Sequence, residues 1–466
     1  MLSKKKFDRI HHTTLRILEQ VGLHIPNQEI LRKLQYKGFS IDFQMQTIKF
    51  PPSLVEQSLT QTPKEVRLYY HASDQHITLG GGKTHFTPSG AGVAVFDLSS
   101  GERRESVSGD VKTLIQMQEV IKQVEITRPI VTASEFGTDS DVVEFYLNFR
   151  HTKKPFIHRT LSGNAVAPVL EMGAHVMGGK EDLRRKPCFC VVYCPNSPLS
   201  FAPENAECML AFAKAGIPVL VLSMSMGGAS APATLWGQAL LINVEVLGGI
   251  TLIQRLYPGT PVLYGSVSSV FDMATGILPL GAPERGILHA VCADVARRYG
   301  IPSLMGGMNT DAKRLDIQSG FEKALTTLPL LGKADVIWGA ASMDSANTYS
   351  FEQLLLDDEM ISAMRRVQSG VQLNMLEEEF PLVCETGWSG NYLTVGHTLK
   401  HYRSFWRPSL MTRTDFDSYM ASGESLERRC KKRITEMLSD APPSVLSSDI
   451  DQELKEVLTK RGIPLP

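Results

Sequence analysis

The sequence lacks an excess of charge of either sign. Its 466 residues include 48 lysine and arginine residues against 49 aspartate and glutamate residues. Such a balance gives no long-range attraction to nucleic acid, and no basic run is long enough to suggest an anionic membrane surface. We therefore expect neither nucleic acid nor a membrane among the partners of this protein.

The sequence also lacks a long hydrophobic run free of polar groups. Its most apolar stretch, Leu235 to Ile253, contains Asn243 and Glu245, and a membrane-spanning helix tolerates few such groups over its roughly 20 residues. The basic N-terminus, Met1 to Asp8, leads into an amphipathic pattern and not into the apolar core of a signal peptide. Seven cysteines, an odd and modest number for this length, favour reduced thiols over disulfides. Together these features predict a cytoplasmic protein.

From about residue 84 onward, short runs of β-branched and aromatic residues alternate with helical patterns. The predicted strands are 85–96, 126–134, 155–159, 188–193, 218–224, 261–266, 302–307 and 335–341. The predicted helices are 110–123, 142–151, 164–177, 204–215, 234–257, 283–298, 320–331 and 350–366. This spacing is typical of parallel βαβ units. Eight units predict a (β/α)8 TIM barrel, and a doubly wound open sheet is the alternative.

The rhythm of strand and helix divides the chain into three parts. Residues 1–80 mix helices and small strands and are predicted to form an N-terminal α+β extension. Residues 81–366 are predicted to form the barrel. Residues 367–466 return to helical patterns and are expected to pack on the barrel or on a second subunit.

Active sites of such barrels lie at the C-terminal ends of the strands. Several aromatic residues fall there, and their ring faces can attract a desolvated cation with about 2 kcal/mol each. The candidates for a cationic pocket are Phe136, Tyr193, Tyr264, Trp338 and Tyr349. The alternative is that each ring only packs in the core of the barrel, as one of its layers of side chains.

The strand ends lack the residues of commoner barrel chemistries. No lysine stands at a predicted strand end, which argues against Schiff-base chemistry. The cysteines at 188, 190 and 194 lie on one strand, with no histidine evidently placed to complete a zinc site. His397 and His401 have helical spacing, and a structural pair is favoured there over a metal site.

Several segments together resemble the trimethylamine methyltransferase family of corrinoid-dependent enzymes. The likeness covers the barrel and the tail, so it extends over most of the chain. The matching segments are GGASAPAT (227–234), NVE (243–245), YGS (264–266), GAPE (281–284), GG (306–307), TDAK (310–313), DIQSG (316–320), YSFEQL (349–354) and HTLKHYR (397–403).

The resemblance implies a methyltransferase. Founding members of the family carry pyrrolysine and demethylate trimethylamine, whereas this chain contains only standard residues. Members without pyrrolysine pass a methyl group from a quaternary amine to the Co(I) of a partner corrinoid protein. Glycine betaine is the first expected substrate, with proline betaine, carnitine and γ-butyrobetaine as others. The chain itself is expected to bind no cofactor or metal and to form a homo-oligomer.

The chemistry of this reaction fits a site without acid, base or metal. A quaternary nitrogen leaves as a neutral amine and Co(I) is already a strong nucleophile, so the protein chiefly positions the reactants. Candidates for binding the substrate carboxylate are His158, Arg159 and Asn196, followed by Asn309 and Asn347. Four residues match the family motif after the seventh strand and are expected to shape the site or the corrinoid-docking rim, or to fix the loop: Asp311, Lys313, Asp316 and Gln318. A metal-dependent barrel hydrolase or lyase and a non-enzymatic betaine-binding protein are the alternatives.

Overall fold

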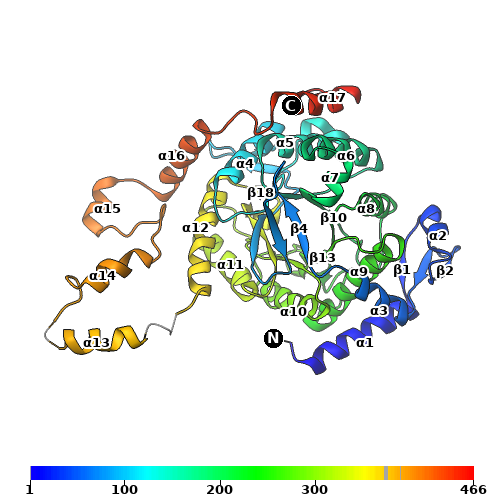
Figure 1. The fold of residues 1–466 in the computed structure, drawn as a ribbon, viewed down its shortest axis with the longest axis horizontal. Helices are drawn as coiled ribbons and strands as arrows, with labels where there is room; N and C mark the ends of the chain where they lie inside the picture. Colours follow the sequence, from blue (N-terminus) through cyan, green and yellow to red (C-terminus); the bar gives the residue numbers. More distant parts are fainter. Residues whose placement is uncertain (1, 372–375, 389) are drawn as a thin grey trace.

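The computed structural model describes residues 2–371, 376–388 and 390–466 (Figure 1). Its centre is a parallel sheet of seven strands. In spatial order these are β6 (His85–Pro88), β16 (Val336–Ala340), β15 (Ser303–Gly306), β13 (Val262–Ser266), β11 (Val219–Ser223), β10 (Phe189–Tyr193) and β9 (Phe156–His158). Every strand pair in this sheet is parallel, as βαβ units require.

The segment around Thr127 closes the sheet into a barrel. On one side, the backbone N–H groups of Glu125 and Ile126 donate to the carbonyl of Phe86 at 3.2 and 3.3 Å. On the other side, the Thr127 N–H donates to the Pro155 carbonyl at 2.9 Å. The prediction of a regular strand over 126–134 is wrong, because only isolated bridges form at Thr127 and Val131. Pro129 lies between them and has no N–H to give to a ladder.

The predicted first strand, 85–96, is also wrong in extent, because it divides into two strands. After β6 the chain turns at Ala91, whose φ is 66°. It then forms β7 (Ala94–Phe96), which belongs to a separate small sheet. That sheet also contains β8 (Arg103–Glu105), β17 (Ser342–Met343) and β18 (Thr348–Tyr349). Because β17 and β18 follow β16, this sheet lies beside the C-terminal end of the barrel.

Helices surround the strands in the order expected from the sequence (Figure 1). They are α4 (Ser108–Val120), α5 (Ser140–His151), α6 (Gly163–Met177), α7 (Lys180–Arg185), α8 (Pro203–Ala215), α9 (Leu235–Leu256), α10 (Pro283–Tyr299), α11 (Ile317–Thr327) and α12 (Phe351–Gln368). Among the described residues, α9 alone is long and apolar enough to cross a membrane. In this fold 78% of its most apolar window is buried, so α9 is a core helix.

Side chains of alternating strand residues form two separate hydrophobic clusters. Val192, Leu220, Leu263 and Leu304 belong to the cluster that fills the barrel interior. That cluster also includes residues of the hairpin β4 (Val66–Tyr69) and β5 (His76–Leu79), which covers the N-terminal end of the barrel. Their strand neighbours Val191, Tyr193, Val221 and Tyr264 belong to the outer cluster between the strands and the helices. This alternation decides which strand residues face the interior.

Two terminal regions complete the fold. The N-terminal region comprises α1 (Lys4–Gln20), β1 (Leu23–His24), α2 (Gln28–Leu34), β2 (Ser40–Asp42), β3 (Thr47–Lys49) and α3 (Pro52–Gln61), and α1 and α3 pack on α9. At the other end, α16 (Leu426–Ser439) packs on α12 and α4, and α17 (Ser448–Lys460) packs on α6 and α5.

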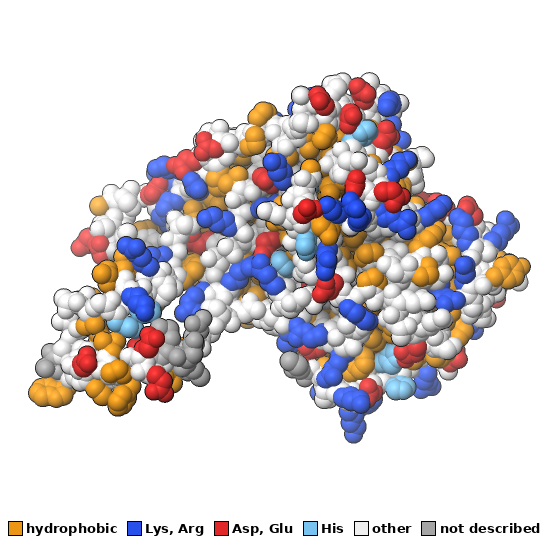
Figure 2. All heavy atoms as spheres, viewed as in Figure 1, with side chains coloured by type: hydrophobic (Ala, Val, Ile, Leu, Met, Phe, Trp, Pro, Cys, Tyr) orange, Lys and Arg blue, Asp and Glu red, His pale blue; other side chains and the backbone are white. Residues whose placement is uncertain are grey.

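Between α12 and α16 the chain forms an arm that stands away from the barrel (Figure 1). Its helices are α13 (Leu376–Thr386), α14 (Gly396–His401) and α15 (Phe416–Ser422), and none of their described side chains is buried. Phe380 and Phe416 are 73% and 74% exposed, and Figure 2 shows hydrophobic side chains over this arm at the lower left. The expected homo-oligomer remains a prediction.

Candidate functional site

A cavity of about 600 Å³ lies at the C-terminal mouth of the barrel. Residues that follow or end nearly every strand contribute to it, as the barrel rule predicts. The lining residues are Ser89, Gly90, Ala91, Arg128, Arg159, Val192, Cys194, Leu222, Met224, Val267, Ile277, Leu278, Leu280, Arg285, Asn309, Trp338, Ser345, Ala346 and Asn347. Three of them are arginines and none is an aspartate or glutamate, so the cavity is strongly cationic.

Arg128 has the least compensated charge in this cavity. Its guanidinium lies 4.0 Å from the centroid of the Trp338 ring, and its Nε and Nη1 are buried without a hydrogen-bond partner. Among the described residues, no carboxylate lies within ion-pair distance of it. Burial lowers the pKa of Arg128 to about 10, and the nearby charge of Arg159 acts in the same direction. A buried guanidinium with free N–H groups is suited to bind an anion.

The backbone of Arg128 is held by a side chain rather than by a strand. Its N–H donates to Gln118 Oε1 at 2.9 Å, and Gln118 Nε2 donates to its carbonyl at 3.0 Å. Gln118 is fully buried in α4. Gly90 allows the guanidinium to lie close to the backbone, because a Cβ at that position would come within 2.2 Å of Arg128 Nε. Arg128 was not among the predicted residues, because it falls inside the irregular second strand.

Arg159, which was predicted, follows β9 and lines the same cavity. It is exposed, and within the described part of the chain it makes no hydrogen bond. Arg159 contributes to the lowered pKa of Arg128, and both guanidinium groups line one cavity. The structure therefore brings together one predicted cation and one that the sequence did not reveal.

Arg285 is the third cation, and it comes from the first turn of α10. Its Nη1 donates to Asn309 Oδ1 at 2.5 Å and to the Leu280 carbonyl at 3.2 Å. Its Nε is buried without a partner. Burial lowers the pKa of Arg285 to about 9, against the opposing effect of Asp311. Asn309 also donates to Ser342 Oγ at 3.0 Å, so its amide is oriented by both neighbours.

Of the five predicted aromatic residues, only Trp338 lines the cavity. Tyr193 and Tyr264 point outward from the barrel, because their strand neighbours Val192 and Leu263 occupy the interior. Tyr349 is buried against Gly92. Phe136, in a short 3-10 helix, packs on the outer cluster. The structure does not bring these rings together as a cage.

The predicted polar residues also separate into two groups. Asn309 and Asn347 line the cavity. His158 is buried beside it, and its Nε2 lies 2.7 Å from Glu144 Oε2. Burial lowers the pKa of His158 despite the opposing effect of Glu144, which favours a neutral ring. Asn196 is exposed in the turn after β10, where it pairs with Ser200.

The four motif residues after β15 lie around the cavity in a network that fixes loops. Asp311 Oδ1 accepts from Leu280 N and Ser345 Oγ, both at 2.7 Å, and its Oδ2 accepts from Gly281 N at 3.0 Å. The other three make local contacts: Lys313 pairs with Asp344 at 2.5 Å, Asp316 caps α11, and Gln318 donates to Glu322 at 2.8 Å. Asp311 thus joins two loops that line the cavity.

We expect Asp311→Ala to loosen these two loops without unfolding the barrel. The substitution removes three hydrogen bonds to one carboxylate, and each such bond contributes about 1.5 to 3 kcal/mol locally. Hydrogen exchange should rise at residues 278–281 and 345–347 and stay unchanged in β10 and β11. Unchanged exchange in both loops would contradict the assigned role. Asp316→Ala, which removes only a helix cap, is the matched control.

The sequence also gave no signal for a buried ion pair behind the cavity. Lys323 Nζ lies 2.9 Å from Asp357 Oδ2, and both side chains are completely buried. Lys323 also donates to the Met308 carbonyl at 2.9 Å, and Asp357 accepts from the Ala341 N–H at 2.7 Å. Met308 and Ala341 have φ values of 54° and 66°. The pair therefore holds two left-handed residues that follow β15 and β16.

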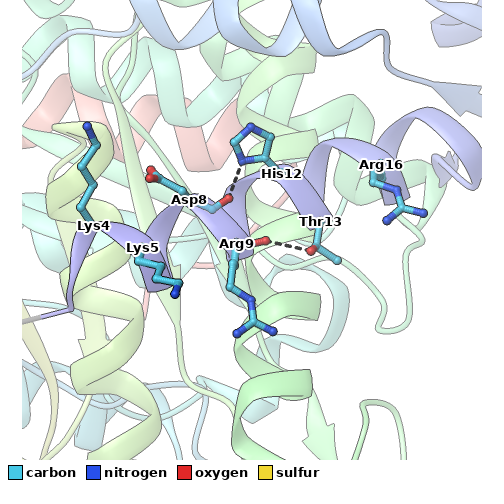
Figure 3. A pocket seen from close by; sticks show the side chains of 7 residues that line it. All are labelled: Lys4, Lys5, Asp8, Arg9, His12, Thr13 and Arg16. Carbon is cyan, nitrogen blue, oxygen red and sulfur yellow. Dashed lines mark hydrogen bonds between the residues drawn. The ribbon is translucent and has the colours of Figure 1, made fainter.

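A surface cavity on α1 and the buried cysteines of β10 and the residue before it carry no functional assignment. A shallow surface cavity of about 640 Å³ is lined by α1 alone, and its basic side chains include Lys4, Arg9 and Arg16 (Figure 3). The face in Figure 2 shows basic and acidic side chains interspersed, in keeping with the balanced composition. Cys188 and Cys190 are buried, and burial raises the pKa of both thiols, which opposes the thiolate form that binds metals.

Comparison with known proteins establishes the family. The family model described as trimethylamine methyltransferase matches residues 1–466. This chain belongs to the trimethylamine methyltransferase family. A relative named trimethylamine methyltransferase from Desulfitobacterium hafniense is 31% identical over 459 residues, which covers 98% of this chain and 92% of the relative. A glycine betaine methyltransferase from the same species is 27% identical over 467 residues, with 99% and 97% covered.

The fold of this protein also resembles that of a solved structure. The structure of monomethylamine methyltransferase from Methanosarcina barkeri aligns with a TM-score of 0.55 and 11% identity. It covers 94% of this chain and 88% of that one. These comparisons confirm the predicted family and the barrel fold, and they make the chain a methyltransferase of the group that acts on methylated amines.

Proposed function

We propose that this protein takes a methyl group from a carboxylate-bearing quaternary amine, with glycine betaine as the first candidate. It passes the methyl group to the Co(I) of a partner corrinoid protein and releases dimethylglycine. The observation that carries the proposal is the pair Arg128 and Arg159 in the cavity, with no acidic side chain in its lining. Carboxylate is the anion that such a pair would hold in a methylated amine.

The same observation argues against trimethylamine as the substrate. Trimethylamine has no anionic group, so its binding would leave the buried Arg128 guanidinium without a counter-charge. Keeping a charge buried and unpaired is costly, and it is tolerated where a ligand supplies the partner. The absence of pyrrolysine from the sequence and the glycine betaine enzyme among the relatives support this choice. Proline betaine, carnitine and γ-butyrobetaine share the carboxylate and remain alternatives.

The residues of this chain need only bind and aim the substrate. Arg128 and Arg159 would hold the carboxylate, and the apolar side chains Leu222 and Val267 would exclude water around the methylated nitrogen. The partner's corrinoid supplies Co(I), whose electron pair forms the new Co–C bond. The electrons of the broken N–C bond stay on nitrogen, so the amine leaves neutral and no proton moves. Fixed geometry then accounts for catalysis without an acid or base.

The positive charge of the cavity also favours the transfer itself. In the bound substrate the nitrogen is cationic, and this charge declines as the methyl group leaves. Nearby guanidinium groups therefore disfavour the bound cation more than the transition state. Binding energy from the carboxylate, which does not react, offsets this unfavourable contact.

An anaerobic assay of Co(I) absorbance tests the proposal. Purified protein is mixed with reduced corrinoid protein and one amine from a panel of quaternary and tertiary amines. We expect loss of Co(I) absorbance with glycine betaine and none with trimethylamine. Arg159→Gln should slow the reaction at low substrate concentration, whereas Lys153→Gln, an exposed substitution at the other end of β9, should not. Loss of Co(I) with trimethylamine alone would overturn the proposal, and binding of betaine without loss of Co(I) would indicate a betaine-binding protein.

A further inference from the structure

We propose that the cavity has a second anion-binding pole around Arg285, and that the preferred substrate is a methylated amino acid with two carboxylates. The inference rests on the proposed function, since it concerns the same cavity and the same reaction. Glycine betaine would occupy only the pole formed by Arg128 and Arg159.

The two poles lie at different positions around the barrel mouth. Arg128 directly follows the segment that takes the second of the eight barrel positions, between β6 and β9. Arg285 lies against the end of β15, the seventh strand, where a Cβ on Gly306 would come within 2.1 Å of its Nη2. The second and seventh positions are three steps apart around a closed barrel of eight strands. A ligand that contacts both arginines must therefore reach from one part of the barrel mouth to another.

Arg285 has hydrogen-bonding capacity that the protein does not use. The acceptors of its Nη1 are neutral, namely the Asn309 amide oxygen and the Leu280 carbonyl. The nearest source of negative charge is Asp311, whose two oxygens already accept from Leu280, Gly281 and Ser345. Asp311 makes no hydrogen bond to Arg285, and Arg285 Nε is buried without a partner. A guanidinium in this state can still bind a carboxylate.

The charged neighbours of the two poles differ. Arg159 contributes to the lowered pKa of Arg128, whereas Asp311 opposes the lowering of the pKa of Arg285. The cavity lining also includes the apolar side chains Leu222, Met224 and Val267.

The charge balance favours a ligand with a net negative charge. Glycine betaine is neutral overall, because one ammonium offsets one carboxylate. In a cavity with three guanidinium groups and no acidic lining residue, a second carboxylate would pair with Arg285 and offset the repulsion on the ammonium. A cavity of about 600 Å³ also has room for more than a betaine with a one-carbon linker. These properties point to a trimethylated amino dicarboxylate.

Calorimetric titration with a matched pair of ligands tests the inference. The pair is N,N,N-trimethylglutamate and N,N,N-trimethylglutamine, which have nearly the same shape and differ by one charge. We expect the full-length protein to bind the glutamate compound at least about tenfold more tightly, the effect of one charged hydrogen bond. Arg285→Gln should abolish this preference, so that the two matched compounds bind with equal affinity. Arg159→Gln should weaken binding of all three compounds.

The outcomes separate the inference from the proposed function. Equal affinity of the unmodified protein for the two matched ligands would overturn the second pole, and so would a preference for the glutamate compound that survives in Arg285→Gln. If glycine betaine binds and is demethylated in either case, the proposed function stands. If none of the three compounds binds, the proposed function itself fails. The ligand comparison uses the unmodified protein, so it decides the matter even if the Arg285 variant does not fold.

Discussion

Replacing Arg128 with methionine is expected to make the protein more stable and almost unable to bind its substrate. The guanidinium is buried without an ion-pair partner. Replacing even a buried ion pair with apolar side chains of similar volume is often neutral or stabilising by about 1 to 4 kcal/mol, and an unpaired charge costs more to bury. Loss of the charged hydrogen bonds to a carboxylate costs about 3 kcal/mol. We therefore expect a melting temperature several degrees higher and a roughly 100-fold weaker affinity for glycine betaine.

Arg365→Met is the matched control for this prediction. Arg365 also stacks on an aromatic ring, that of Phe86 at 5.3 Å, but it pairs with Glu125 at 2.7 Å and does not line the cavity. Its replacement should lower stability and leave substrate affinity unchanged. The two substitutions are thus expected to change the melting temperature in opposite directions. This difference distinguishes an arginine that binds a ligand from one that stabilises the fold. A lower melting temperature for Arg128→Met with intact binding would refute the assignment.

The second large effect is expected at the buried pair Lys323 and Asp357. Burial raises the pKa of the Asp357 carboxyl and lowers the pKa of the Lys323 amine, although the two groups attract each other. Removing one partner leaves the other charge buried alone, so Lys323→Met or Asp357→Leu should each cost about 3 to 5 kcal/mol of unfolding free energy. Denaturant titration followed by circular dichroism measures this loss.

The double variant separates charge burial from loop positioning. Lys323→Met with Asp357→Leu removes both charges and should recover most of the lost stability. It cannot restore the bonds to the Met308 carbonyl and the Ala341 N–H. Because Asn309 follows Met308, substrate affinity should therefore remain reduced in the double variant. Full recovery of binding would show that the pair does not position the cavity.

The sequence predicted the barrel well because its strands are short, apolar and separated by helices with clear ends. Pro218, Pro261 and Pro302 stand directly before β11, β13 and β15, as expected for a first position that needs no ladder donor. The second strand was misjudged because Pro129 breaks its ladder. Arg128, which lies beside that proline, was missed for the same reason.

The directions of the aromatic side chains could not be read from the sequence. Strands of a parallel barrel are buried on both faces, so Val192 and Tyr193 are equally apolar positions in the pattern. Only the closed sheet shows that Val192 and Leu263 face the interior while Tyr193 and Tyr264 face the helices. Arg159 was found because it follows a strand directly. Arg285 was not, because it reaches the mouth from the first turn of a helix.

The attachment of Arg128 to Gln118 has a consequence for local opening of the chain. The Arg128 amide is protected by a side chain of α4, at 2.9 Å, and not by a neighbouring strand. Its deuterium uptake should therefore follow the opening of α4, while the amide of Ile157, bonded to the Thr127 carbonyl at 3.0 Å, follows the opening of the sheet. The backbone of Arg128, the residue proposed to bind the substrate carboxylate, is therefore expected to open together with the outer helical layer and not with the barrel strands.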